Sequence, residues 1–194
     1  MSKAEKALER TSVRWFRTAL FYVTLMIASV YKGQYAPITE IPTVGVYESK
    51  RGEQLEINRE ELVKKALKAR RNAWAPYSGF QVGAALLAED GTVYGGCNIE
   101  NASYGATNCA ERTAFFRAVY EGKRDFLAIA VAGMARDAET GEYCPPCGIC
   151  LQVMAEFCDA EQFEIILAKN EKEYLVYRLK EFLPLSFTGK DMKK

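Results

Sequence analysis

The stretch FQVGAALLAEDGTVYGGCNI, residues 80–99, predicts a β-hairpin at the centre of a buried sheet. Its first nine residues, 80–88, are nearly all apolar, which indicates a strand that is covered on both faces. Asp90-Gly91 is typical of a tight hairpin turn, and TVYGGCNI, residues 92–99, supplies the partner strand. The rest of the chain is therefore expected to cover this hairpin from both sides.

Helices and strands alternate around this hairpin. Asn58 and Glu61 form a capping box for a helix that should end before Pro76. A second helix is expected at 109–121, closed by Gly122. Three further strands and one helix are predicted: strands at 126–134, 163–168 and 173–179, and a helix at 147–158 that follows two prolines. This alternation predicts an α/β fold whose sheet carries helices on both faces.

Residues 1–52 are set apart as an N-terminal extension, and residues 53–194 as one domain. The segment 18–31 is uncharged and mostly apolar, and it follows three arginines. A basic start before a short apolar run resembles a signal peptide, although no small-residue cleavage site follows. The run is shorter than the about 20 apolar residues that a membrane span needs. Three interpretations stay open: an export signal or anchor, a packed helix, or an extension peripheral to function.

The composition excludes several classes of site. The chain has 194 residues, of which 49% are hydrophobic, enough for one buried core. Its 26 basic and 25 acidic residues give a net charge of +1, so the charge balance does not point to nucleic acid. The chain contains no histidine, which excludes Ser-His-Asp and Cys-His catalysis and histidine metal sites. Proton transfer must therefore use Asp, Glu, Lys, Tyr or Cys.

Six cysteines are present, and three of them form a C-x-x-C-x-x-C run at 144–150. An even count is compatible with three disulfides in a secreted protein, but this clustering favours thiolate ligands for a metal in a reducing compartment. The expected zinc ligands are Cys109, Cys147 and Cys150, with a fourth position open for water. A structural zinc that takes Cys144 or Cys97 as its fourth ligand is the alternative.

The proposed ligands lie at the starts of two predicted helices. Zn²⁺ with three thiolates carries a net charge of −1, which is costly away from water. Helix N-termini carry partial positive charge and free N–H groups, so two of them aimed at the metal would stabilise this charge. Arg112, three residues beyond Cys109, is expected to donate to the sulfurs from outside the ligand set.

Glu111 lies two residues after the first of these thiols. At that spacing it can approach a metal-bound water without being a ligand, take its proton and pass that proton to a substrate nitrogen. The carboxylate would then do the work of the missing imidazole. The plain alternative is a glutamate that only complements the dipole of a helix start, which is common in first helical turns.

Two segments resemble the cytidine deaminases, specifically the small homotetrameric type with three zinc cysteines. They are YSGFQVGAALLAEDGTVYGGCNIENASYGATNCAERTAF, at 77–115, and PPCGICLQVMAEF, at 145–157. The resemblance covers roughly residues 58–187 and includes the deaminase signature of ligand-x-Glu followed by Pro-Cys-x-x-Cys. It implies a three-layer α-β-α sandwich around a mixed sheet of about five strands, with 53–194 as the catalytic domain.

The resemblance also implies an activity, a cofactor and site residues. The activity is zinc-dependent hydrolytic deamination of cytidine and deoxycytidine in cytoplasmic pyrimidine salvage, with one Zn²⁺ per subunit. Water activated by Glu111 attacks C4 of the base, and Glu111 protonates N3 and then the leaving ammonia. The substrate contacts implied are Asn98 and Glu100 on the ribose 3′-hydroxyl, Phe80 against the base, the Ala110 N–H on the base, and Tyr104 and Phe187 toward neighbouring subunits. No nucleic acid or membrane partner is expected.

One position departs from the family pattern. The family usually has arginine after the second cysteine of Cys-x-x-Cys, whereas this chain has Leu151. An arginine there would draw charge from the thiolates, so Arg112 would carry that role alone. Cys97, Cys144 and Cys158 match no family ligand position and are interpreted as packing thiols. Two other functions are weighed: a related aminohydrolase such as a blasticidin-type deaminase, and a zinc-stabilised binding module without catalysis.

Overall fold

The computed structural model describes residues 43–48, 52, 54–138, 140–188 and 191–192. The chain divides between Thr39 and Glu40, and every described element belongs to the part that begins at Glu40. The apolar segment 18–31 lies outside the described residues, so its three interpretations stay predictions. Within the described residues, no helix combines the length and the apolar character needed to cross a membrane.

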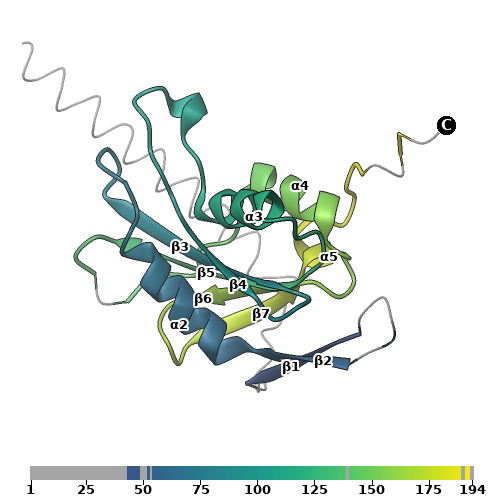
Figure 1. Ribbon diagram of the computed structural model, residues 1–194. Coiled ribbons are helices and arrows are strands. Elements are labelled where there is room, and N and C mark those ends of the chain that lie inside the picture. Colours follow the sequence, from purple (N-terminus) through teal and green to yellow (C-terminus); the bar gives the residue numbers. More distant parts are fainter. Residues whose placement is uncertain (1–42, 49–51, 53, 139, 189–190, 193–194) are drawn as a thin grey trace, which may run out of the picture. The chain divides into compact units, whose positions relative to one another are not determined.

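A five-stranded sheet forms the centre of the described part, in the order β4-β3-β5-β6-β7 (Figure 1). The strands are β3 (Phe80–Ala88), β4 (Val93–Cys97), β5 (Phe126–Ala135), β6 (Glu164–Ala168) and β7 (Tyr174–Arg178). β5 and β6 pair in parallel, while the other neighbouring strands pair antiparallel. The predicted hairpin is confirmed as β3 and β4, and the expected mixed sheet of about five strands is confirmed with it.

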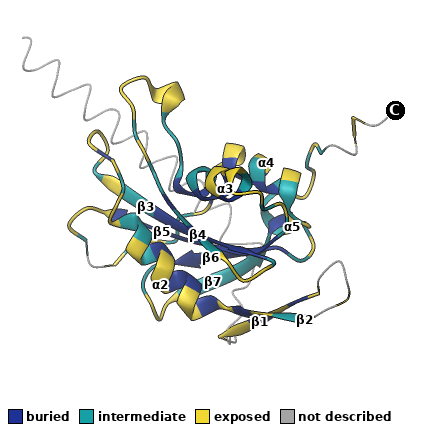
Figure 2. Cartoon of the chain, viewed as in Figure 1, coloured by how far each residue is buried: buried dark blue, intermediate teal, exposed yellow. Residues whose placement is uncertain are grey.

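Helices cover both faces of this sheet. α2 (Arg59–Arg70) lies on one face, and α3 (Ala110–Tyr120), α4 (Gly148–Phe157) and the short α5 (Leu179–Phe182) lie on the other (Figure 1). Buried residues gather on the strands and on the helix sides that face them (Figure 2). Ala84 and Leu86 belong to the α3/α4 core and Ala85 and Leu87 to the α2 core, as the period of two in a strand requires. The predicted three-layer sandwich is confirmed.

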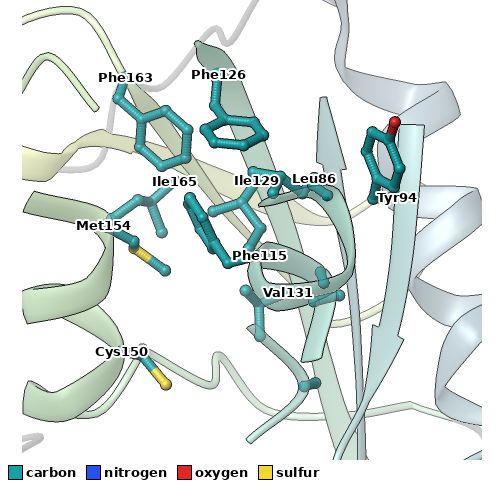
Figure 3. Close-up of a cluster of buried hydrophobic side chains, with 14 of the residues drawn as sticks. Leu86, Tyr94, Phe115, Phe126, Ile129, Val131, Cys150, Met154, Phe163 and Ile165 are labelled. Carbon is teal, nitrogen blue, oxygen red and sulfur yellow. The ribbon is translucent and has the colours of Figure 1, made fainter. Parts of the chain in front are cut away.

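The core between the sheet and α3/α4 is rich in aromatic rings. Phe115 from α3 packs edge-on against Phe126 of β5, with ring centroids 5.1 Å apart, and its ring also lies 6.2 Å from that of Phe163 (Figure 3). Met154 of α4 joins the same cluster and is fully buried. Large rings of this kind contribute much of the apolar area that a core removes from water. They hold α3 and α4 firmly against the sheet.

A two-stranded hairpin precedes α2 and was not expected from the sequence. It consists of β1 (Val44–Glu48) and β2 (Gln54–Asn58), paired antiparallel. Tyr47 of β1 and Ile57 of β2 are buried in the core beside α2, so the hairpin packs with the elements that follow it. The segment VGVYE, residues 44–48, is not followed by a two-residue turn signal that would indicate a hairpin.

A buried ion pair lies beneath this hairpin. Arg59, the first residue of α2, donates to both oxygens of Glu164 at 2.8 and 2.7 Å, and Arg178 approaches the same carboxylate at 3.3 Å. Glu164 is completely buried. A Cβ at Gly45 would lie 2.7 Å from the Arg59 guanidinium, so the backbone of β1 covers the pair closely. A buried charge needs such partners, and the hairpin encloses them.

The predicted helix after Asn58 is confirmed, and it ends before Pro76 as expected. The Asn58 side chain caps α2 by accepting a hydrogen bond from the Glu61 N–H at 3.0 Å. The last residue of the helix is Arg70. The chain turns after it, and Trp74 forms a parallel bridge with Ile99.

A glycine in β4 allows a helix to approach the hairpin closely. A Cβ at Gly96 of β4 would lie 2.3 Å from the Ala110 carbonyl oxygen and 2.5 Å from the Ala114 N of α3. At the neighbouring Gly95, which points to the other face, a Cβ would meet only the Ala69 methyl, at 3.7 Å. The start of α3 therefore depends on the missing side chain at Gly96.

We expect Gly96→Ala to lower the free energy of unfolding by about 1–3 kcal/mol, because backbone atoms of α3 must move to admit the methyl group. Gly95→Ala is the matched control and should change it by less than about 1 kcal/mol. Equilibrium unfolding in urea measures both. Equal stability of the two variants would contradict the close contact between β4 and α3.

Candidate active site

Three thiols from two helix starts meet at one point. Cys109 is the N-cap residue of α3, Cys147 is the N-cap residue of α4, and Cys150 lies in the first turn of α4. The Sγ atoms of Cys109 and Cys147 are 3.8 Å apart, those of Cys147 and Cys150 are 3.5 Å apart, and all three lie within 4.8 Å of one another. The structure therefore brings together the three cysteines that the sequence analysis grouped.

This spacing fits a zinc ion. A tetrahedral zinc with Zn–S bonds of about 2.3 Å holds its sulfurs roughly 3.8 Å apart. The Cys109–Cys147 and Cys147–Cys150 separations, 3.8 and 3.5 Å, lie close to that value. Among the described residues, no other cysteine, aspartate or glutamate joins the group. Three protein ligands with one open position is the arrangement of catalytic rather than structural zinc sites.

The other three cysteines lie apart from this group, and all six are free thiols. The alternative of three disulfides is therefore wrong. Cys97 donates to the Asn72 carbonyl oxygen at 3.4 Å. Burial raises the pKa of Cys144 to about 12, so that side chain stays a neutral thiol. Neither Cys97 nor Cys144 supplies a fourth ligand within the described cluster, which leaves the open position available.

The surroundings favour a thiolate at Cys109. A hydrogen bond from the Cys150 thiol lowers the pKa of Cys109 to about 5, and Arg112 contributes in the same direction. The same partnership raises the pKa of Cys150. One Nη of Arg112 lies 3.9 Å from the Cys109 sulfur and 3.0 Å from the Thr107 carbonyl oxygen. Arg112 thus approaches the sulfurs, as the sequence analysis expected.

Glu111 is buried beside the thiols, with 5% of its surface exposed. Burial raises its pKa to about 7, and the negative charge of Cys109 adds to the shift. A glutamate that only complemented a helix dipole would stand in solvent at this position, where its pKa would be ordinary. A carboxyl group with a pKa near neutrality can accept and release a proton readily. These properties suit a proton carrier.

Asn98, Glu100 and Phe80 come together at the end of the hairpin. The Asn98 amide donates to the Phe80 carbonyl oxygen at 2.9 Å and accepts from the Val82 N–H at 2.8 Å. Glu100 accepts hydrogen bonds from the backbone N–H of Tyr77 at 2.9 Å and from Ser78. Asn98 and Glu100 therefore fix the loop before β3 as well as carrying the polar groups expected to meet a sugar.

Ser78 is a residue that the sequence analysis did not single out. Its hydroxyl lies 2.5 Å from a Glu100 oxygen and 3.0 Å from the Phe80 nitrogen. The available signal was a serine two residues before Phe80 in the turn-rich segment APYSGF. Its partner Glu100 lies 22 residues away in the chain, which local patterns do not reveal.

Of the three remaining residues expected to contact substrate, one is buried and two are exposed. Ala110 is buried at the start of α3, between Cys109 and Glu111 in the chain. Tyr104 lies in a short 3₁₀ turn with 74% of its surface exposed, and Phe187 near the C-terminus is 63% exposed. The Phe187 carbonyl oxygen accepts from the Gln152 side chain at 2.7 Å. Tyr104 and Phe187 thus present aromatic surface outward from their own chain.

Leu151 is 7% exposed and belongs to the apolar core between the sheet and α3/α4. It follows Cys150 directly, but its side chain packs among hydrophobic neighbours and offers no donor to the thiols. Where the family usually has an arginine, this chain therefore has an apolar side chain that packs in the core.

Comparisons with known proteins agree with this geometry. Residues 56–165 match the sequence profile of the family described as the cytidine and deoxycytidylate deaminase zinc-binding region. A cytidine deaminase from Halalkalibacterium halodurans is 52% identical over 136 residues, which cover 70% of this chain and 98% of that protein. A probable cytidine deaminase from Dictyostelium discoideum is 40% identical over 139 residues, covering 70% and 90%.

Solved structures give the same result. A crystal structure of cytidine deaminase from Burkholderia pseudomallei matches with 45% identity and a TM-score of 0.61, covering 68% of this chain and all of that one. A crystal structure of cytidine deaminase from Mycobacterium tuberculosis matches with 36% identity and a TM-score of 0.58, covering 68% and 98%.

We expect Cys109→Ala to abolish tight zinc binding, because it removes one of three converging thiolates. Cys144→Ala is the matched control: its thiol lies outside the cluster, so about one zinc per chain should remain. Zinc content after dialysis against a chelator measures both variants. Loss of zinc from the Cys144 variant, with retention in the Cys109 variant, would contradict the assignment of ligands.

Proposed function

The chain belongs to the cytidine deaminase family, and from that membership we propose that it hydrolyses cytidine and deoxycytidine to uridine and deoxyuridine, with release of ammonia. The observation that supports this most strongly is the buried Glu111 beside three converging thiols. A metal ligand set with an open position and an adjacent proton carrier is what hydrolytic deamination requires. A zinc module without catalysis would have no need of a buried carboxyl group there.

Cys109, Cys147 and Cys150 would hold the zinc ion. When bound, the ion supplies a water molecule acidic enough to act as a nucleophile near neutral pH. The N-termini of α3 and α4 both face the thiolates and offset their excess negative charge. Arg112 adds a full positive charge 3.9 Å from the Cys109 sulfur.

Glu111 would carry the proton during the reaction. It would accept a proton as water oxygen bonds to C4 of the base, and deliver it to N3. A second proton transfer through Glu111 to the amino group would let the C4–N bond break, so that ammonia leaves and a carbonyl forms at C4. A carboxyl group whose pKa is raised to about 7 suits both directions of transfer.

The expected substrate is a free nucleoside. Asn98 and Glu100 would hydrogen-bond the ribose 3′-hydroxyl, Phe80 would pack on the base, and the Ala110 N–H would bind it. An amide and a carboxylate can together satisfy a hydroxyl as donor and acceptor. The segment NIENASYG, residues 98–105, carries no basic residue that could hold a phosphate, which supports a nucleoside over a nucleotide.

Assembly as a homotetramer in the cytoplasm completes the proposal. Tyr104 and Phe187 both present exposed aromatic rings, which fits residues that complete the pocket of a neighbouring subunit. Six free thiols fit a reducing compartment, where such a zinc site keeps its ligands. The enzyme would act there in pyrimidine salvage.

The oligomeric state can be measured directly. We expect the purified chain to have a mass of about four times 21.8 kDa by light scattering. Tyr104→Ala should retain zinc while the Michaelis constant for cytidine rises, since the ring would serve a neighbouring site. A monomeric protein with full activity would contradict the shared pocket.

The activity itself is tested with Glu111→Gln. The loss of cytidine ultraviolet absorbance should proceed with the native protein and fall by a factor of about 10² to 10⁴ in the variant, because the amide cannot carry the proton. Both proteins should hold about one zinc per chain. The matched control is Glu121→Gln, at the exposed far end of the same helix, which should leave turnover unchanged. Full turnover by the Glu111 variant would refute the assigned role.

A further inference from the structure

The hydroxyl of Ser78 joins two residues that the proposed function places on opposite parts of the substrate. Ser78 lies in the loop between α2 and β3, two residues before Phe80. Its oxygen is 2.5 Å from Oε1 of Glu100 and 3.0 Å from the backbone nitrogen of Phe80. Phe80 would contact the base and Glu100 the sugar, so one small side chain connects both contacts.

The direction of each hydrogen bond follows from the chemistry of the partners. An ionised carboxylate only accepts, so the single Ser78 proton points to Glu100. A backbone N–H only donates, so Phe80 donates to a lone pair of the Ser78 oxygen. The Phe80 carbonyl in turn accepts from the Asn98 amide at 2.9 Å. Both backbone polar groups of Phe80 are therefore held by side chains of this network.

The contacts of Glu100 leave little freedom to its carboxylate. Oε2 accepts from the N–H groups of Tyr77 and Ser78 at 2.9 and 3.2 Å, and Oε1 accepts from the Ser78 hydroxyl. A carboxylate offers about four acceptor sites, so these three bonds leave about one, on Oε1. That remaining site can take one hydroxyl proton, as a single sugar hydroxyl would supply.

The same contacts keep Glu100 ionised. Partial burial would raise its pKa, but the hydrogen bonds from Ser78 and from the backbone N–H of Tyr77 outweigh it and hold the pKa below the usual value. The side chain therefore stays an acceptor at neutral pH. Tyr77 and Ser78 are themselves exposed, so this loop is not part of the core.

We infer that Ser78 is a positioning residue for nucleoside binding: it orients the Glu100 carboxylate toward the sugar hydroxyl and ties it to the backbone of Phe80. This inference rests on the proposed function, because it takes the ribose contact of Glu100 from it. Since the loop is exposed, removal of the hydroxyl should weaken recognition of the sugar without unfolding the domain.

The test compares cytidine with 3′-deoxycytidine in the native protein, Ser78→Ala and Ser78→Thr. With Ser78→Ala, kcat/KM for cytidine should fall about tenfold, mainly through KM, as expected for one charge-assisted hydrogen bond. The value for 3′-deoxycytidine should change by less than about twofold, because the lost contact is absent there already. Ser78→Thr retains a hydroxyl and should restore most of the cytidine value.

Two further measurements separate positioning from a general structural effect. Thr92→Ala removes a hydroxyl from the exposed turn between β3 and β4 and should leave both substrates unaffected. Carbon-detected NMR of Glu100 should show a higher pKa in Ser78→Ala, since a donor to the charged form is lost. This readout does not depend on turnover.

The outcomes distinguish this inference from the proposed function. Equal losses on both nucleosides in Ser78→Ala, or no loss on cytidine, would overturn the positioning role while deamination by the native protein stood. A native protein that deaminates neither nucleoside would overturn the proposed function, and the ribose role of Ser78 with it.

Discussion

The convergence of two helix N-termini on one point is the constraint on which the site depends. β3 pairs antiparallel with both β4 and β5, so β4 and β5 run in the same direction. α3 follows β4 and α4 follows β5, so both helices begin from the same edge of the sheet and lie on the same face (Figure 1). Their free N–H groups and partial positive charges can then stabilise a cluster of thiolates that neither helix could hold alone.

This convergence is maintained by packing rather than by the thiols. Phe115 and Met154 anchor α3 and α4 in one apolar core, and Gly96 lets α3 approach β4 at backbone contact distance. Close packing of this kind leaves helices few alternative positions. Glu111 in the first turn of α3 is buried as well, and this burial raises the pKa of its carboxyl group. The packing of α3 and α4 against the sheet thus positions the cysteine ligands, and burial at the start of α3 raises the pKa of Glu111.

Local features of the fold and site could be predicted from the sequence, while long-range ones could not. The hairpin at 80–99 and the thiols at two helix starts depend on neighbouring residues, so their patterns are visible in the chain. β1 was missed because no two-residue turn signal follows it, and because it covers the pair between Arg59 and Glu164, which are 105 residues apart. Ser78 was missed because the partner of its hydroxyl, Glu100, lies 22 residues away in the chain. Spatial partners that lie far apart in the chain leave no periodic signal.

Leu151 shows how the charge of the site is balanced in this chain. Its side chain is buried in the apolar core, so it cannot compensate the thiolates. Among the described residues, Arg112 is the cationic side chain with a hydrogen bond to a ligand sulfur, and its buried Nε has no hydrogen-bond partner there. The compensation of negative charge therefore rests on the two helix N-termini and on one guanidinium. A chain built in this way gains apolar packing behind Cys150 and leaves more of the charge on the sulfurs, so its thiolates should donate more strongly to a bound metal than those flanked by a second arginine.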